Sequence, residues 1–401
     1  MANVSSSNGL EKYPKLRFKG FSEPWEHVKL SDFVSRVTRK NSDNQTDIPL
    51  TISSKDGLIN QNEFFSKQVA SKDMSGYYLL QRGEFAYNKS YSVGFDFGSI
   101  KRLEKYDQGA LSTLYICFAL DRFDSDFIKH YFDSLKWYRE IYMISAEGAR
   151  NHGLLNVPTE DFFATLHTLP MDAAEQRKIA EFLDLLTSKI EKQQVLVDNL
   201  KKYKRGLLSA VFSRELSFSD GQWISKPFAE IAHLGKKRYT PSPNESKPCI
   251  ELEHIEQLTG RLLGSVNSSE QNSQKSAFEK GDVLFGKLRP YLKKYALPDF
   301  EGVCSTEIWV FKPTECITSE FLYYLVQSEE FINAANISSG TKMPRAEWSK
   351  VASTVFFLPN TEDQTKIVNL LMKIDKKINT ESMLLEKLEQ FKKASLQKLF
   401  V

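Results

Sequence analysis

Few residues of this chain have the types and spacing that chemistry requires, and the clearest candidate is a phosphate-binding loop. Residues 281–288, GDVLFGKL, match the G-x4-G-K spacing of a P-loop but end in Leu288, where magnesium needs a Ser or Thr hydroxyl. Pro290 then opposes the helix whose N-terminus would hold the phosphate. A related segment, residues 83–90, has a Ser at its end but lacks the second Gly. A turn that leads into a strand explains both segments better than a nucleotide site.

Metal and dinucleotide sites are also unsupported. The six histidines have no metal-ligand spacing, and the four cysteines include no C-x2-C pair. No G-x-G-x-x-G segment follows an expected strand. We therefore expect a non-catalytic binding protein with no catalytic residue, no metal and no cofactor of its own.

Basic residues cluster with turns and aromatic residues in both halves of the chain. Such side chains can neutralise phosphates and reach base edges, where Arg and Lys pair with guanine and Asn pairs with adenine. A solvated charged surface explains any one of these residues equally well. Because they recur in both halves, we favour a nucleic-acid-binding role for them.

The composition restricts where this chain can act. The chain has 401 residues, with 54 basic and 51 acidic side chains, so any basic surface must be local. No stretch approaches the roughly 18 apolar residues that span a bilayer, and the N-terminus lacks the apolar core of a secretory signal. We expect a cytoplasmic protein with no membrane contact.

An internal duplication organises the chain. Residues 175–213 align without a gap to residues 363–401, at an offset of 188. A shared apolar spacing could arise by chance, but so many long polar matches favour duplication. The identical pairs are Gln176/Gln364, Lys178/Lys366, Ile179/Ile367, Leu183/Leu371, Lys189/Lys377, Ile190/Ile378, Leu196/Leu384, Leu200/Leu388, Lys204/Lys392, Leu208/Leu396 and Phe212/Phe400.

Each repeated segment is predicted to be one long helix. Both follow a Leu-Pro pair and contain no Pro, and Asp172 and Thr361 are the expected N-caps. About 38 residues give a rod of roughly 57 Å. A heptad-like apolar seam on each rod needs a partner, and the other copy is the simplest one; packing of each helix on its own domain is the alternative. The expected seam residues are Leu183, Leu186, Ile190, Val197, Leu200, Leu371, Ile374, Ile378, Leu385 and Leu388.

The segments between the helices repeat more faintly. Residues 83–89 match 281–287, and the region of Trp25 parallels that of Trp223, in the same order. Short strand-like runs mix with short amphipathic helices, without the long alternation of a doubly wound sheet. We predict an α+β fold with two similar domains, 1–170 and 214–358, each followed by a long helix, 171–213 and 359–401. The polar stretches 53–62 and 267–275 are expected to be irregular loops.

These features together resemble the specificity subunit of type I restriction–modification enzymes. The resemblance rests on the helix starts LPMDAAEQRKI and LPNTEDQTKI, the helix ends LLSAVF and SLQKLF, and the opening PKLRFKGF. It spans essentially the whole chain. The second helix start has one residue fewer between Pro359 and Gln364 than the first has between Pro170 and Gln176.

The resemblance implies a division of labour. Two target-recognition domains on an antiparallel helix pair would each read one half of an asymmetric, bipartite site on double-stranded DNA. The helices would set the spacer and dock modification (methyltransferase) subunits, and restriction subunits would complete the complex. S-adenosylmethionine, ATP and magnesium are then expected on those partners, not on this chain.

Within this interpretation, seven residues are the candidate DNA contacts. Two alternatives remain open from the sequence: a structural coiled-coil adaptor without DNA specificity, and an enzyme with an unrecognised site. The candidates are Lys89, Arg150, Asn151, Lys287, Arg289, Lys342 and Arg345.

Overall fold

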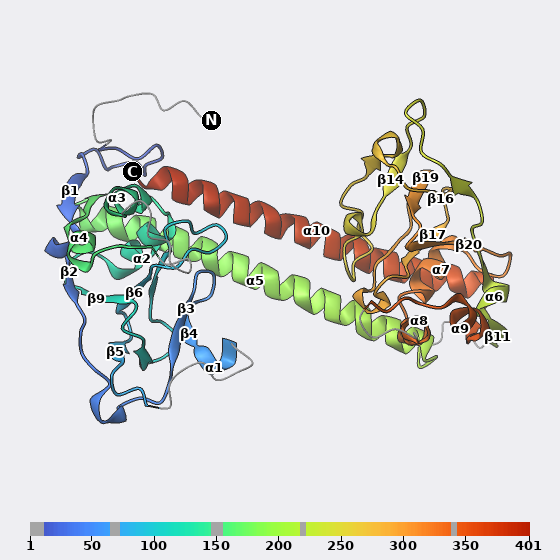
Figure 1. Cartoon of the computed structure of the whole chain (residues 1–401), viewed down its shortest axis with the longest axis horizontal. Helices are drawn as coiled ribbons and strands as arrows, with labels where there is room; N and C mark the ends of the chain where they lie inside the picture. Colours follow the sequence, from blue (N-terminus) through green and yellow to red (C-terminus); the bar gives the residue numbers. More distant parts are fainter. Residues whose placement is uncertain (1–11, 65–72, 146–154, 217–221, 338–342) are drawn as a thin grey trace. The chain divides into compact units, whose positions relative to one another are not determined.

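The computed structural model describes residues 12–64, 73–145, 155–216, 222–337 and 343–401 (Figure 1). The chain forms two compact units, one of residues 1–193 with 384–401 and one of residues 194–383. Each unit therefore contains one globular domain and one end of each long helix. Among the described residues, no helix combines the length and the apolar character needed to cross a membrane.

A four-stranded antiparallel sheet forms the centre of the first unit. Its strand order is β2-β9-β6-β7: Val34–Arg36, Ile116–Leu120, Phe85–Asn88 and Ser99–Arg102. Three antiparallel pairs accompany it: β1 (Glu26–Lys29) with β10 (Leu166–Leu169), β3 (Leu50–Ser53) with β4 (Gly57–Asn60), and β5 (Tyr78–Gln81) with β8 (Gln108–Leu111). The helices are α1 (Gln61–Phe64), α2 (Ser125–Asp133), α3 (Tyr138–Ile144) and α4 (Thr159–Ala164), with short 3-10 turns at Leu30–Asp32 and Ser42–Asn44.

The second unit has a sheet of the same order, β12-β20-β17-β18: Ala232–Leu234, Ile308–Pro313, Val283–Gly286 and Tyr295–Ala296. β11 (Ile224–Pro227) pairs with β21 (Val355–Leu358). A five-stranded sheet has the order β13 (Arg238–Tyr239), β16 (Lys275–Phe278), β19 (Gly302–Ser305), β14 (Pro248–Ile250) and β15 (Val266–Asn267). The helices are α6 (Phe228–Ile231), α7 (Ser319–Leu325), α8 (Glu329–Asn336) and α9 (Trp348–Ser353), with 3-10 turns at Leu252–His254, Ser268–Glu270 and Pro290–Leu292.

The two domains thus share a fold. Both four-stranded sheets are antiparallel throughout, and in each the third strand is the one that follows a Gly turn: β6 after Gly83 and β17 after Gly281. The P-loop-like segment is therefore a turn into a strand. Its second glycine has a packing role, because a Cβ on Gly286 would lie 2.9 Å from Cδ2 of Leu252. The prediction of an α+β chain with two similar domains is confirmed.

The sequence expectation for residues 53–62 was wrong. Residues 53–62 are not an irregular loop, because β3 and β4 form a hairpin through them and bury Leu58 and Ile59. The alternation of apolar and polar residues in this stretch is too short to be recognised as a strand without its partner.

The long helices are α5 (Ala173–Phe212) and α10 (Thr361–Leu399). Asp172 caps α5, since its Oδ1 accepts the Ala174 N–H at 2.7 Å. The predicted cap Thr361 is the first residue of α10, and the cap is Asn360, whose Oδ1 accepts the Asp363 N–H at 2.9 Å. The missing residue in the second helix start shifts the cap by one position relative to Pro359.

The two helices pair in antiparallel fashion within each unit (Figure 1). In the first unit the start of α5 meets the end of α10, where the rings of Phe182 and Phe391 lie 6.3 Å apart. In the second unit Lys204, near the end of α5, bonds to Asp375 of α10 at 2.7 Å. All ten predicted seam residues are buried or half-buried. Leu183, Leu186, Val197, Leu371 and Leu385 are buried, and Ile190, Leu200, Ile374, Ile378 and Leu388 are half-buried.

A repeated glutamine joins each domain to its helix. Gln176 accepts the N–H of Asp124, the N-cap of α2, at 2.8 Å and donates to the Pro170 carbonyl at 2.8 Å. Gln364 accepts the N–H of Thr318, the N-cap of α7, at 3.0 Å and donates to the carbonyls of Cys316 and Pro359. The same side chain therefore hydrogen-bonds to backbone groups at a helix start in both units. This shared role accounts for the identity of Gln176 and Gln364 in the repeat.

We predict that Gln364→Ala lowers the free energy of unfolding by about 1–3 kcal/mol, because it leaves half-buried backbone groups of residues 316 and 318 without partners. Urea unfolding of the purified chain measures the effect. Gln390→Ala, at an exposed position of the same helix, is the matched control. Equal stability of the two variants would contradict the role assigned to Gln364.

We also predict that Leu200→Asp disturbs the helix pair, because it places a charge in the seam. Leu196→Asp is the control, since Leu196 lies one turn away and its side chain is 40% exposed. Thermal unfolding should show a fall in melting temperature for the Leu200 variant of several degrees relative to the control, about the effect of 1–2 kcal/mol. Indistinguishable melting curves would argue against a seam at Leu200.

Candidate nucleic-acid interface

Three of the predicted contacts in the second unit meet at one end of the four-stranded sheet. Lys287 directly follows β17, and its N–H donates to the Glu307 carbonyl at 2.9 Å, just before β20. Its own carbonyl accepts the Ala346 N–H at 2.8 Å, and the Arg289 N–H donates to the Pro344 carbonyl at 2.8 Å. Backbone pairing thus brings two segments about 55 residues apart into one edge. Lys287, Arg289 and Arg345 share that edge.

Arg289 is held in an unusual backbone conformation. Its φ is 53°, in the left-handed region, and its side chain is exposed. Lys293, four residues on, also has a positive φ, of 49°, so a short 3-10 turn is bounded by two left-handed residues. Such a conformation costs of order 1–3 kcal/mol in a residue other than Gly, and these residues concentrate at binding sites. The backbone bond to Pro344 fixes it here.

Arg345 already has an acidic neighbour. Its Nε donates to Glu307 Oε2 at 3.0 Å, and the Arg345 side chain is 50% exposed. An ion pair this exposed contributes little to stability. The Arg345 guanidinium can therefore leave Glu307 and bind a phosphate or a base with little loss of stability. Glu307 was not among the predicted site residues, although the faint repeat places it at a strand start where the first domain has Leu114.

Other basic and aromatic residues close to these candidates in the sequence stabilise the fold. Lys294 donates its Nζ to the Leu252 carbonyl at 2.6 Å, and burial lowers the pKa of this amine. Lys293 pairs with Glu329 at 2.8 Å. Tyr295 and Tyr87 are buried and donate their hydroxyls to backbone carbonyls. Lys294 and the two tyrosines are therefore not available as contacts in this arrangement.

The first unit has part of the same arrangement at the end of β6. Lys89 directly follows β6, and its carbonyl accepts the Leu155 N–H at 3.0 Å, as the Lys287 carbonyl accepts that of Ala346. Lys89 is half-buried, and Tyr91 beside it is 58% exposed. The predicted contacts Arg150, Asn151 and Lys342 lie outside the described residues. In the described part of the chain, no three His, Cys, Asp or Glu side chains gather as a metal site would require.

Sequence and structure comparisons place these domains among known proteins. Residues 221–390 match the family model of the type I restriction modification DNA specificity domain. The specificity subunit of the type I restriction enzyme EcoDI of Escherichia coli is 23% identical over 231 residues, 49% of this chain and 52% of that protein. The specificity subunit of HindI of Haemophilus influenzae is 32% identical over 135 residues, 32% of this chain and 29% of that protein. The matched part of the chain thus spans about half the length of the first relative, and less of the second.

Solved structures extend the likeness to the whole chain. The S subunit of a type I restriction–modification system from M. genitalium gives a TM-score of 0.58 at 14% identity, covering 97% of this chain and 99% of that one. A chain from a study of complex assembly and conformational transition in a type I system gives 0.56 at 15% identity, covering 94% and 97%. At these identities the likeness concerns the fold. This chain therefore carries a type I restriction modification DNA specificity domain at residues 221–390, and along its length it has the fold of type I specificity subunits.

Proposed function

We propose that this chain is the DNA-recognition subunit of a type I restriction–modification complex and reads an asymmetric, bipartite target. One observation carries the proposal: the domain that matches the DNA specificity family has a second copy of its fold in the first unit. Two recognition domains in one chain can read two half-sites. Their loops differ in sequence and length, so the two half-sites differ as well.

The end of β17 is the proposed reading edge of the second domain. The backbone of Arg289 is held by its bond to Pro344 and its side chain is exposed, so the guanidinium is placed to pair with a guanine edge. Lys287 and Arg345 beside it are suited to phosphates. Lys89 has the equivalent place after β6, and Arg150, Asn151 and Lys342 remain proposed contacts from the sequence.

The long helices are proposed to set the distance between half-sites and to receive the modification subunits. A helix of 40 residues such as α5 is about 60 Å long, which exceeds the roughly 34–36 Å between half-sites one turn apart. Apolar side chains also remain exposed on the helices, and exposed apolar surface marks interaction sites. They include Leu185, Val195 and Tyr203 on α5 and Met372, Met383 and Phe391 on α10.

The chemistry of the complex is proposed to lie on its partners. Modification subunits would bind S-adenosylmethionine and methylate adenine, and restriction subunits would use ATP and magnesium. The present chain would supply DNA specificity only.

Co-expression with the cognate modification subunit should produce new adenine methylation at a split motif, two short defined halves around a fixed gap. Genome-wide mapping of methylated adenine measures this. Replacing residues 1–170 with those of another specificity subunit should change only one half. A stable complex that methylates no split motif would favour a structural adaptor, and modification by the purified chain alone would point to an enzyme.

Arg289→Ala should weaken DNA binding by about 1–3 kcal/mol and relax the motif at one position of one half-site. Lys280→Ala is the control, because Lys280 is exposed at the opposite end of the same strand. Binding titrations at several salt concentrations and methylation mapping distinguish the two variants. An unchanged motif and affinity would remove Arg289 from the reading edge.

A further inference from the structure

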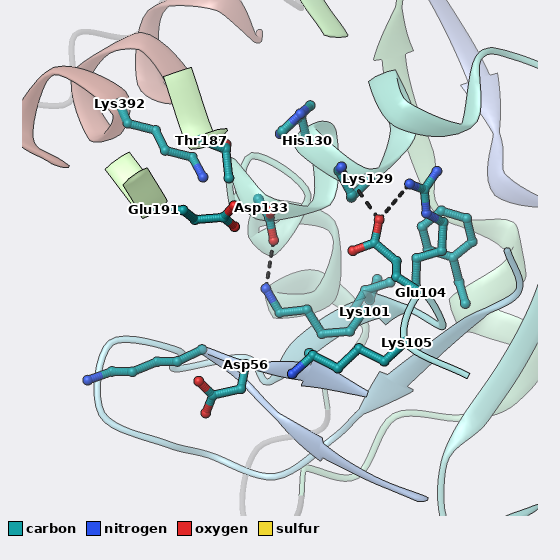
Figure 2. A pocket seen from close by; sticks show the side chains of 15 residues that line it. Asp56, Lys101, Glu104, Lys105, Lys129, His130, Asp133, Thr187, Glu191 and Lys392 are labelled. Carbon is teal, nitrogen blue, oxygen red and sulfur yellow. Dashed lines mark hydrogen bonds and ion pairs between the residues drawn. The ribbon is translucent and has the colours of Figure 1, made fainter. Parts of the chain in front are cut away.

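A charged cavity lies in the first unit, apart from the proposed reading edge. Its volume is about 390 Å³, and it is lined by the β3–β4 turn, β7 and the loop after it, α2, α5 and the last turns of α10 (Figure 2). Six basic side chains face four acidic ones across it. The basic ones are Lys55, Lys101, Arg102, Lys105, Lys129 and Lys392.

Most of the deeper cations are neutralised, but Lys392 is not. Lys101 pairs with Asp133 at 2.7 Å, and Lys129 pairs with Asp184 at 2.9 Å. Among the ion pairs of the described residues, none includes Lys392, although its side chain is half-buried. Figure 2 shows its ammonium group directed toward Thr187 and Glu191. Burial lowers its pKa, the ammonium groups of Lys101 and Lys129 lower it as well, and the carboxylates of Asp133 and Glu191 oppose that shift.

In the second unit, the lysine equivalent to Lys392 has a carboxylate partner. The repeat pairs Lys392 with Lys204, which is buried and bonds to Asp375 at 2.7 Å. Asp375 also accepts the Tyr324 hydroxyl at 2.8 Å. The same alignment pairs Asp375 with Thr187, whose hydroxyl donates to the Leu183 carbonyl instead. The first unit therefore has the same lysine as the second but lacks the carboxylate that neutralises it there.

We propose that this cavity binds a compact oxyanion of the phosphate type beside Lys392, in place of the carboxylate that Asp375 supplies in the second unit. Lysines are suited to phosphate as flexible point charges. The charged lining, with only Phe85 and Ile100 as large apolar members, favours a small polyanion over an apolar ligand. The phosphate group is either a free anion or part of the backbone of bound DNA.

Three proteins test this: the wild-type chain, Thr187→Asp and Lys392→Met. Their melting temperatures are compared in sodium phosphate and in sodium chloride at equal pH and ionic strength, and inorganic phosphate is titrated by calorimetry. Phosphate should raise the melting temperature of the wild type by a few degrees. Thr187→Asp should melt higher in chloride and lose that increment, because it supplies the carboxylate internally. Lys392→Met should weaken phosphate binding about tenfold.

Lys387→Met is the matched control, since it removes one exposed lysine from the same helix and should retain the increment. DNA titrations identify the source of the phosphate group. If DNA supplies it, free phosphate has little effect, but Lys392→Met and Thr187→Asp weaken DNA binding, and Lys392→Met reduces the salt slope by about one. A phosphate increment equal in all four proteins, or no difference among them with either ligand, would overturn the proposal.

Discussion

Each long helix carries an apolar seam that it cannot leave in water, and this requirement shapes both units. A helix of about 40 residues with one apolar stripe must cover that stripe, and antiparallel pairing places the end of one helix beside the start of the other. The last residues of the chain, Leu399 and Phe400, are consequently buried in the first domain, where Phe400 contacts Trp25 and Phe127. The core of the first domain is complete only when α10 is in place.

The duplication explains why the same structural contacts occur in both units. Gln176 and Gln364 dock equivalent helix starts, and β6 and β17 end at equivalent lysines. What diverges are the loops after those strands and the charges along the seam. The duplication therefore keeps the way each domain is attached to its helix, while the loops after the strands and the charges on the helices have diverged.

Much of this fold could be predicted from the residues. The spacing of Leu183, Leu371 and their neighbours predicted the seam, and the Leu-Pro pairs placed the helix starts within two residues. The site was less predictable. Lys294 lies close to Lys287 and Arg289 in the sequence, but its amine bonds to the Leu252 carbonyl, contributed by a segment about 40 residues away. Local composition cannot show such a partner.

The duplication, the paired helices and the α+β class could be inferred from the residues alone, because periodicity and repeated identities are properties of their order. Which charges meet could be seen only in the folded chain. Lys204 and Lys392 are identical in the repeat, yet one bonds to Asp375 and the other faces a cavity. That difference depends on which residue the antiparallel register places opposite each lysine, and register is fixed only when the helices pack.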